Sequence, residues 1–305
     1  MFRSGFVALV GRPNVGKSTL LNQLIGMKVA ITSPVMQTTR HRIRGVRTSE
    51  KGQLVFLDTP GFSKPLDSLG HYLVAEGLAA VSEADAFVLV VDGSVPPGPG
   101  DAWVVEQLRQ TGRFIWLVLN KLDRLKNDPG KKVTHTRLYG ELLNGYAHWK
   151  HRWVSAKTNK NVETLADSLL RTMPEGPPYY PEDATTDQRL REMAAETVRE
   201  KVLLHTREEI PHSVAIGVET FVEEAERGLT SITMTLYVDQ ESQKGILIGK
   251  NGSMLKTIGT QARQDLETLM EQQVFLKLQV KVRRNWRKDA DFLKSLGLAL
   301  PTGAG

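Results

Sequence analysis

The chain has 305 residues, of which 40% are hydrophobic and 24% charged, a composition typical of one large or two medium globular domains. It contains no cysteine, which excludes disulfides, thiolate catalysis and cysteine-based zinc sites. The net charge of +6 is compatible with anionic partners such as nucleic acid or a membrane surface, and no apolar run reaches the roughly 20 residues of a transmembrane helix.

The first 173 residues alternate between strand-like and helix-like segments. Short apolar runs typical of buried parallel strands occupy residues 6–10, 54–57, 86–91 and 114–119, and amphipathic stretches such as 18–26 and 101–112 lie between them. This alternation predicts an α/β domain over residues 1–173, with a mostly parallel sheet covered on both faces. Because a functional motif is reached by Gly11, we expect no signal peptide and a cytoplasmic protein.

The segment between the first strand and the first helix matches the P-loop pattern G-x-x-x-x-G-K-[ST] in full. It consists of Gly11, Arg12, Pro13, Asn14, Val15, Gly16, Lys17 and Ser18, and is followed by Thr19. The glycines let backbone N–H groups turn toward phosphate oxygens, and the helix N-terminus adds its partial positive charge. We expect Lys17 to contact the β- and γ-phosphates and the Ser18 hydroxyl to ligate Mg²⁺.

Two further motifs point to guanine as the base. The segment Asn120-Lys121-Leu122-Asp123 follows the 114–119 strand, and Ser155-Ala156-Lys157 follows a later apolar pair. The Asp123 carboxylate can accept both N1–H and the 2-amino N–H of guanine, a donor pair that adenine lacks. The backbone N–H of Ala156 can reach the guanine O6.

A fourth motif, Asp58-Thr59-Pro60-Gly61, follows the 54–57 strand. There Asp58 can hold Mg²⁺ through water, and the Gly61 N–H can contact the γ-phosphate and so sense hydrolysis. Taken alone, this segment reads as a simple turn, but it stands in order with the other three motifs.

These four motifs, each at a strand end, resemble the translation-factor-related class of GTPases over about 170 residues. The segment Gln37-Thr38-Thr39-Arg40-His41 resembles the first switch of that class. The resemblance implies a threonine that closes over Mg²⁺ and the γ-phosphate, and the motif alignment favours Thr39 over Thr38.

The residue after Gly61 departs from the Ras-type pattern, which places a water-orienting glutamine there. Here it is Phe62, whose ring cannot hydrogen-bond a water molecule. The pattern resembles a subset of GTPases in which some members use a potassium ion held partly by the P-loop asparagine, here Asn14. We therefore expect slow intrinsic hydrolysis that depends on Lys17, Asn14, Thr39 and Gly61, and K⁺ stimulation as a hypothesis.

The amino-acid composition changes after residue 173. Residues 174–183 hold four prolines, one glycine and no lysine or arginine, which predicts an extended linker over residues 174–188. An α-β-β-α-β order follows, with a helix at 189–209, strands at 213–223 and 229–239, a helix at 253–270 and a strand at 274–282. We predict a smaller α+β domain over residues 189–305, including a C-terminal tail.

This second domain contains a G-x-x-G loop, Gly249-Lys250-Asn251-Gly252, after the aliphatic run 246–248. Such a loop is usually only a turn, but here strands precede it and a helix and a strand follow. The combination resembles a type II KH domain, whose loop clamps about four nucleotides of single-stranded nucleic acid.

The last predicted strand begins a basic run, Lys277–Lys288, that contains no acidic residue. We predict that Lys281, Arg283 and Arg284 contact RNA, although lysines that protect a sheet edge from pairing are an equal alternative. Trp286 can either stack on a base or pack against the domain.

A G domain joined to a C-terminal KH domain resembles the Era family of bacterial GTPases over nearly the whole chain. The resemblance implies a GTPase that binds single-stranded 16S rRNA near its 3′ end. It would act in 30S ribosomal subunit assembly and rRNA maturation, with Mg²⁺ as cofactor. It also implies peripheral association with the inner face of the cell membrane, and we expect a monomer.

Two other functions stay open at this point. One is an RNA-binding module whose G domain binds nucleotide but barely turns over. The other is a tRNA-modification or membrane-traffic GTPase, which the KH loop argues against. If the main interpretation holds, the linker should let the GTP state at Thr39 and Gly61 bias the exposure of the KH loop.

Overall fold

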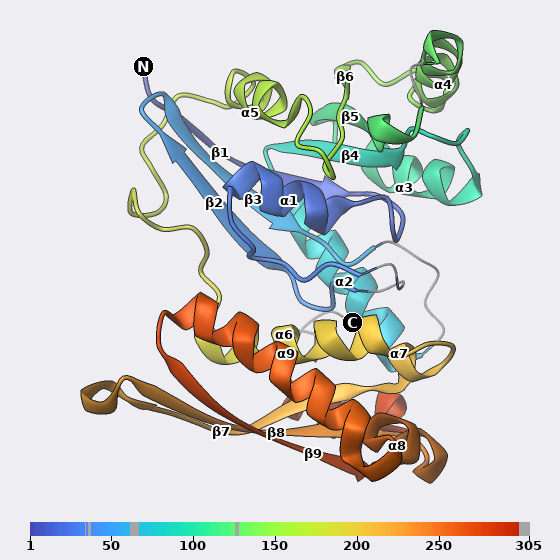
Figure 1. Cartoon of the computed structure of the whole chain (residues 1–305). Helices are drawn as coiled ribbons and strands as arrows, with labels where there is room; N and C mark the ends of the chain where they lie inside the picture. The colour runs from blue at the N-terminus through green and yellow to red at the C-terminus, as the bar shows by residue number, and fades with distance from the viewer. Residues whose placement is uncertain (34, 36–37, 62–66, 126–127, 299–305) are drawn as a thin grey trace. The chain divides into compact units, whose positions relative to one another are not determined.

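The protein is described by a computed structural model that covers residues 1–33, 35, 38–61, 67–125 and 128–298. The described chain divides into two compact units, formed mainly by residues 1–187 and by residues 188–298 (Figure 1). Each unit has its own sheet and its own hydrophobic core. Among the described helices, none combines the length and the apolar character needed to cross a membrane.

The first unit is built on a six-stranded sheet with the order β2-β3-β1-β4-β5-β6, in which only β2 runs antiparallel to its neighbour. Its strands are β1 (Arg3–Val10), β2 (Ile43–Ser49), β3 (Gly52–Asp58), β4 (Ala86–Asp92), β5 (Phe114–Asn120) and β6 (Trp149–Trp153). Its helices are α1 (Lys17–Ile25), α2 (Ser68–Glu83), α3 (Pro99–Arg109), α4 (Pro129–Leu142) and α5 (Val162–Leu170), with a short 3₁₀ turn η1 (Leu122–Leu125). The predicted α/β fold is confirmed.

Two hydrophobic cores lie on the two faces of this sheet, because successive strand residues point to opposite sides. In β1, Val7 and Leu9 enter the core beneath α1 and α5, whereas Ala8 and Val10 enter the core on the other face. Parallel strands buried on both faces need apolar residues at every position, which explains the continuous apolar runs in the sequence. The carboxyl ends of these strands meet at one edge, where the loops that carry the nucleotide motifs begin.

The second unit has a three-stranded sheet with the order β7-β8-β9, in which β7 is antiparallel and β9 parallel to β8. Its strands are β7 (Ala215–Glu224), β8 (Leu229–Val238) and β9 (Gln273–Val282). Its helices are α6 (Leu190–His205), α7 (Ile210–Ser213), α8 (Glu241–Ile248), α9 (Ser253–Met270) and α10 (Ala290–Ser295), with 3₁₀ turns η2 (Ala225–Arg227), η3 (Lys250–Gly252) and η4 (Trp286–Lys288).

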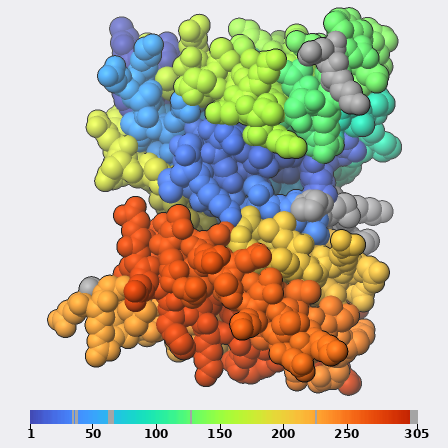
Figure 2. Space-filling view, in the orientation of Figure 1, coloured from blue at the N-terminus to red at the C-terminus, as the bar shows by residue number. Residues whose placement is uncertain are grey.

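Helices α6 and α9 pack on this sheet through a core that includes Val198, Ile232 and Leu266. The order of the long elements agrees with the predicted α+β domain, and α9 has the predicted limits. The aliphatic run 246–248 belongs to helix α8, so the G-x-x-G loop joins two helices. Both helices lie on the surface in the space-filling view, in orange tones (Figure 2).

The segment between α5 and α6 contains no helix or strand, and hydrogen bonds hold it to the first unit. The buried side chain of Gln53 in β3 accepts the backbone N–H groups of Tyr179 and Tyr180, at 2.7 and 3.0 Å. The same amide donates to the Tyr180 carbonyl at 2.9 Å, and the Tyr179 ring packs 4.7 Å from that of Phe6. One buried glutamine thus holds two consecutive linker residues.

Further along, the linker reaches the edge strand β2. The Val46 N–H donates to the Thr185 carbonyl at 2.8 Å, and the Thr186 hydroxyl donates to the Arg44 carbonyl at 2.7 Å. The Arg44 guanidinium forms an ion pair with Asp187 at 2.9 Å. The segment therefore covers part of an otherwise open sheet edge.

Candidate functional site

The P-loop wraps the N-terminus of α1 and depends on two glycines with left-handed or unusual backbone angles. Gly16 has φ 97°, and a Cβ built there would lie 2.4 Å from the Asn120 Nδ2. Gly11 has φ 149°, and its Cβ would lie 2.3 Å from the Val90 carbonyl oxygen. Only glycine fits these two places, because backbone and a buried amide approach from the side where a Cβ would stand.

Lys17 is buried at the start of α1, with its ammonium group folded over the loop. Its Nζ donates to the carbonyl oxygens of Gly11 and Arg12, both at 3.1 Å. Burial lowers the pKa of Lys17 to about 8, and the negative charge of Asp58 opposes this shift. Phosphate oxygens placed at the same loop would favour the charged ammonium further.

The three predicted metal ligands come together beside this lysine. The Ser18 hydroxyl donates to the Asp58 Oδ2 at 2.7 Å, and the Thr39 hydroxyl donates to the same oxygen at 3.1 Å. The two hydroxyl oxygens are 2.9 Å apart. The hydroxyl of Thr38 instead donates to the Val35 carbonyl at 2.6 Å, which agrees with the preference for Thr39.

The Asp58 carboxyl is fully buried, and burial raises its pKa, while Lys17 and the hydrogen bonds from Ser18 and Thr39 act in the opposite direction. Its other oxygen, Oδ1, is buried and has no hydrogen-bond partner among the described residues. Two hydroxyl oxygens and a carboxylate with a spare oxygen form a donor set that suits Mg²⁺, a hard cation that keeps several waters. The residues present therefore fit the predicted ion.

The motifs predicted to bind the base also meet, with Asn120 at their centre. Its Nδ2 donates to the Val15 carbonyl at 2.9 Å, and its Oδ1 accepts the Ala156 N–H at 2.9 Å. The Asp123 carboxylate accepts the Ser155 hydroxyl at 2.5 Å and is otherwise exposed. Asn120 therefore joins the P-loop to the Ala156 loop, while the Asp123 carboxylate is accessible to a base.

Lys121 connects the same two regions through its ammonium group. Its Nζ donates to the Asn14 carbonyl at 2.8 Å and forms an ion pair with Asp92 at 2.7 Å. Asp92, the last residue of β4, was not predicted as a site residue. Its position after an apolar strand, next to Gly93, was a signal of the kind that identified Asp58.

The remaining predicted nucleotide residues have varied surroundings. The Arg12 guanidinium pairs with the buried Asp101 of α3 at 2.8 Å, so its side chain serves the fold of the loop. The buried Thr59 hydroxyl donates to the Leu9 carbonyl at 2.8 Å. Gly61 packs so closely on Pro13 that a Cβ would lie 2.9 Å from the proline Cα.

Three further predicted residues lie in or beside these motifs. The side chain of Lys157 is exposed, whereas Thr19 and Pro60 lie in the P-loop helix and the Asp58 loop. The predictions that concern Phe62 and Gln37 fall outside the described residues.

The second unit presents the G-x-x-G loop between α8 and α9. Gly249 has φ 71°, and a Cβ there would lie 2.7 Å from the Met254 Cβ, whereas Gly252 has φ 77° with open space around it. Asn251 also has a positive φ, of 52°, and Lys250 is exposed. The loop is thus a tight backbone turn at the N-terminus of an 18-residue helix, where an anion is electrostatically favoured.

The basic run Lys277–Lys288, which begins within β9 and continues after it, divides into exposed and structural residues. Lys281 and Arg284 are exposed. Arg283 forms an ion pair with Asp289 at 2.7 Å and lies 4.1 Å from the centre of the Phe292 ring, so it already has partners in its own unit. Trp286 is fully buried, and its indole N–H donates to the Ser213 carbonyl at 2.8 Å, which favours packing over base stacking.

Comparisons with known proteins agree with this geometry. Residues 6–121 match the family model "50S ribosome-binding GTPase", and residues 209–287 match a KH domain model. GTPase Era of Heliobacterium modesticaldum is 46% identical over 297 residues, which cover 97% of each chain. The chain belongs to the GTPase Era family. The Era protein of Carboxydothermus hydrogenoformans is 43% identical over 97% of this chain and 98% of its own.

Two solved Era structures match the whole fold. Aquifex aeolicus Era bound to GDP and aluminium fluoride superposes with a TM-score of 0.93 at 36% identity, covering 98% of this chain and 100% of that chain. An Era complex with MgGDPNP and nucleotides 1506–1542 of 16S ribosomal RNA gives a TM-score of 0.92 at 38% identity, with the same coverage. As a member of the Era family, the protein is a GTPase with a C-terminal KH domain.

Proposed function

We propose that the protein binds GTP with Mg²⁺, hydrolyses it slowly, and binds single-stranded 16S rRNA near its 3′ end through its KH domain. We place this activity in small (30S) ribosomal subunit assembly and rRNA maturation. The observation that carries the proposal is the cluster of Ser18, Thr39 and Asp58 beside the buried Lys17, in a chain that also holds a KH loop. The Era structures with nucleotide and with rRNA support it by similarity.

In the nucleotide site, Mg²⁺ would neutralise charge on the β- and γ-phosphates, with Ser18 and Thr39 as direct ligands and Asp58 acting through water. Lys17 would leave its two carbonyl partners for phosphate oxygens. The Gly61 N–H would contact the γ-phosphate. Asp123 would select guanine. Asn120 would fix the position of the Ala156 loop relative to the P-loop through its two hydrogen bonds.

For hydrolysis, the chain offers no glutamine after Gly61, so the attacking water has to be oriented by other groups. We propose that turnover is slow and that K⁺, held partly by Asn14, stimulates it. The test is the GTP turnover rate in potassium and in sodium buffer at equal ionic strength. An equal rate in both buffers would reject the role of K⁺.

For RNA binding, we assign the backbone clamp to Gly249, Lys250, Asn251 and Gly252, with phosphate contacts from Lys281 and Arg284. The tight glycines allow the RNA backbone to approach, and Lys250 supplies an exposed positive charge. Arg283 would contribute only if its ion pair with Asp289 opened.

Sequencing RNA that is cross-linked to the GTP-bound protein tests the target. Enrichment of small-subunit rRNA is expected, and enrichment of tRNA or mRNA over it would reject the assignment. Measuring GTP turnover with and without that RNA separates a working GTPase from an RNA-binding module with an idle G domain. Multiple turnovers support the former.

We also propose functional boundaries at residues 1–173 for the G domain, 174–188 for the linker and 189–305 for the RNA-binding domain. We expect a cytoplasmic monomer that associates peripherally with the inner face of the cell membrane, for which the net charge of +6 is the only support from the chain. Co-sedimentation with anionic lipid vesicles, compared with neutral ones, tests the membrane contact.

A further inference from the structure

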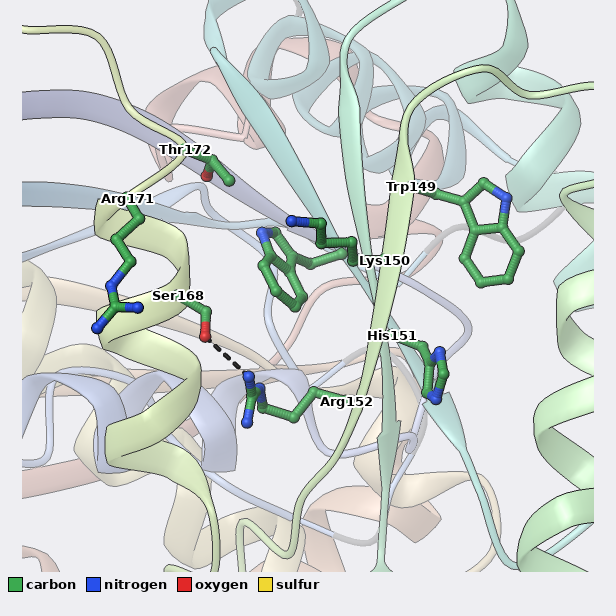
Figure 3. A pocket seen from close by; sticks show the side chains of 8 residues that line it. Trp149, Lys150, His151, Arg152, Ser168, Arg171 and Thr172 are labelled. Carbon is green, nitrogen blue, oxygen red and sulfur yellow. Dashed lines mark hydrogen bonds between the residues drawn. The ribbon is translucent and has the colours of Figure 1, made fainter.

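A cavity of about 610 Å³ lies between β6 and α5 in the first unit (Figure 3). Lys150 and Arg152 project from β6 toward this helix, whereas Trp149 and His151 point to the opposite side of the strand, as alternation requires. The far wall is the C-terminal end of α5, which contributes Ser168 and Arg171. None of the eight lining residues is acidic.

The cavity is separate from the nucleotide motifs. Those motifs follow the carboxyl ends of the parallel strands, as Asn120 does at the end of β5. Trp116, which lines the cavity, lies in the first half of the same strand, and Arg171 lies at the end of α5. A molecule bound here would not occupy the P-loop.

Two side chains that line the cavity each hold a buried N–H without a partner among the described residues. The indole Nε1–H of Trp116 and the Nε–H of Arg152 are both buried and bond to nothing among the described residues. The Trp116 side chain is only 4% exposed, and the Arg152 guanidinium lies 5.8 Å from the centre of its ring. An unsatisfied buried donor costs about 1–3 kcal/mol, so a ligand oxygen that the Trp116 N–H could reach by a small side-chain rotation would be favoured here. The Arg152 guanidinium has one partner of its own, because its Nη2 donates to the Ser168 hydroxyl at 2.9 Å.

The charged side chains around these donors also lack counterions. Neither Lys150 nor Arg171 forms an ion pair with any described residue, and both are exposed. The hydroxyl groups add no free donor: Ser168 donates to the Thr164 carbonyl and Thr172 to the Leu169 carbonyl. The cavity thus presents cationic and N–H donors around an aromatic floor, the complement of a phosphate with an attached sugar or base.

Two simpler explanations account for the exposed cations of the cavity but not for all of its features. Cations on an edge strand such as β6 discourage pairing with another strand, and an arginine at a helix C-terminus interacts well with the helix dipole. Both account for exposed charges. Neither accounts for the unpartnered indole N–H of Trp116.

We propose that the β6–α5 cavity is a second binding site for the sugar-phosphate backbone of an RNA strand, on the G domain itself. Lys150, Arg152 and Arg171 contact phosphate oxygens, and the Trp116 N–H donates to a phosphate or sugar oxygen. The lining cations suit phosphate contacts, which position a strand without reading its sequence. Recognition of the backbone favours a strand over one particular free nucleotide.

The test uses the full chain with its nucleotide site saturated by Mg·GDP and a short single-stranded oligoadenylate RNA as probe. The readout is the indole ¹⁵N–¹H signal of Trp116, assigned with the Trp116→Phe variant, which reports on this cavity and not on the KH loop. We expect a saturable shift of that signal. No shift at RNA concentrations that saturate the protein would overturn the proposal.

A matched pair of variants separates local contacts from general charge. Lys150→Gln/Arg171→Gln removes two cations of the cavity, and Lys131→Gln/Arg137→Gln removes two exposed cations of α4. The first variant should weaken the RNA affinity measured from that shift about a hundredfold, since each of the two lost hydrogen bonds from a charged group is worth about 1.5 kcal/mol or more. The second should leave it unchanged, and equal weakening by both would overturn the proposal.

Two further ligands identify the source of the phosphate. If AMP shifts the Trp116 signal as tightly as the RNA does, the site belongs to a free nucleotide and the assignment to a strand is wrong. If an oligoglutamate peptide shifts it as tightly, the site is a general acidic-ligand site and the assignment to phosphate is wrong. A clear preference for the RNA over both supports the proposal.

Discussion

Replacing Asn120 by alanine removes the side chain that joins the P-loop to the Ala156 loop. Both groups that it bonds, the Val15 carbonyl and the Ala156 N–H, belong to residues only 2% exposed, at distances of 2.9 Å. Each orphaned group costs about 1–3 kcal/mol, so we expect Asn120→Ala to lower the unfolding free energy by about 2–6 kcal/mol. That is a large share of the 5–15 kcal/mol typical of a domain.

The assay is urea unfolding followed by tryptophan fluorescence, since Trp116 and Trp153 lie in the core of this unit. Lys157→Ala is the control, because its exposed side chain should change the free energy by no more than about 0.5 kcal/mol. Added GDP should stabilise the Asn120→Ala variant less than the parent chain, because part of the free energy of binding is needed to order the P-loop and the Ala156 loop. A loss below about 1 kcal/mol, or equal stabilisation by GDP, would refute the reasoning.

Three other substitutions test separate parts of the site. Asp123→Ala should abolish the preference for GTP over inosine triphosphate, which lacks the 2-amino group. Competition binding measures both nucleotides, and a preserved preference would exclude Asp123 as the residue that reads the base. Thr39→Ala should raise the Mg²⁺ concentration needed for half-maximal GTP turnover while leaving GDP affinity unchanged, and an unchanged Mg²⁺ requirement would contradict its role as a ligand. Arg44→Gln should reduce the difference in RNA affinity between the GTP- and GDP-bound forms. Arg47→Gln is the control, since Arg47 lies on the same strand but pairs with Glu163. Equal effects of both variants would count against a coupling between bound nucleotide and RNA affinity through Arg44.

Much of the fold was predictable because its signals are local. The apolar runs, the glycines of the P-loop and the G-x-x-G loop each report on neighbouring residues, and these elements lie where the sequence predicts them. Helix α8 was not predicted, since its short aliphatic run reads equally as a strand end. Periodicity alone cannot separate short buried segments of the two kinds.

Side-chain roles were harder to predict because they depend on distant partners. Trp286 is buried because its indole meets the Ser213 carbonyl, 73 residues earlier in the chain, and Arg283 is held by Asp289 and Phe292. Asn120 contributes through the loops that it joins, although the motif alone suggests a contact with the base. No local pattern encodes such pairings, which arise from tertiary packing.

The contacts of the linker also depend on distant partners. They bear on how a change of bound nucleotide could affect the RNA-binding domain. Arg44 lies in β2, the strand that follows the Thr39 segment, and its guanidinium contacts Glu83 at the end of α2 as well as Asp187 just before α6. All three side chains are about one-third exposed, so each ion pair contributes at most about 1 kcal/mol. Only the pair with Asp187 holds the linker, and its contribution of about 1 kcal/mol lies at the lower end of the 1–3 kcal/mol of typical allosteric coupling, enough to bias an equilibrium several-fold. The linker is also held to β2 by the Val46–Thr185 and Thr186–Arg44 hydrogen bonds, so a nucleotide-driven shift of β2 would release that end of the linker only by breaking these as well.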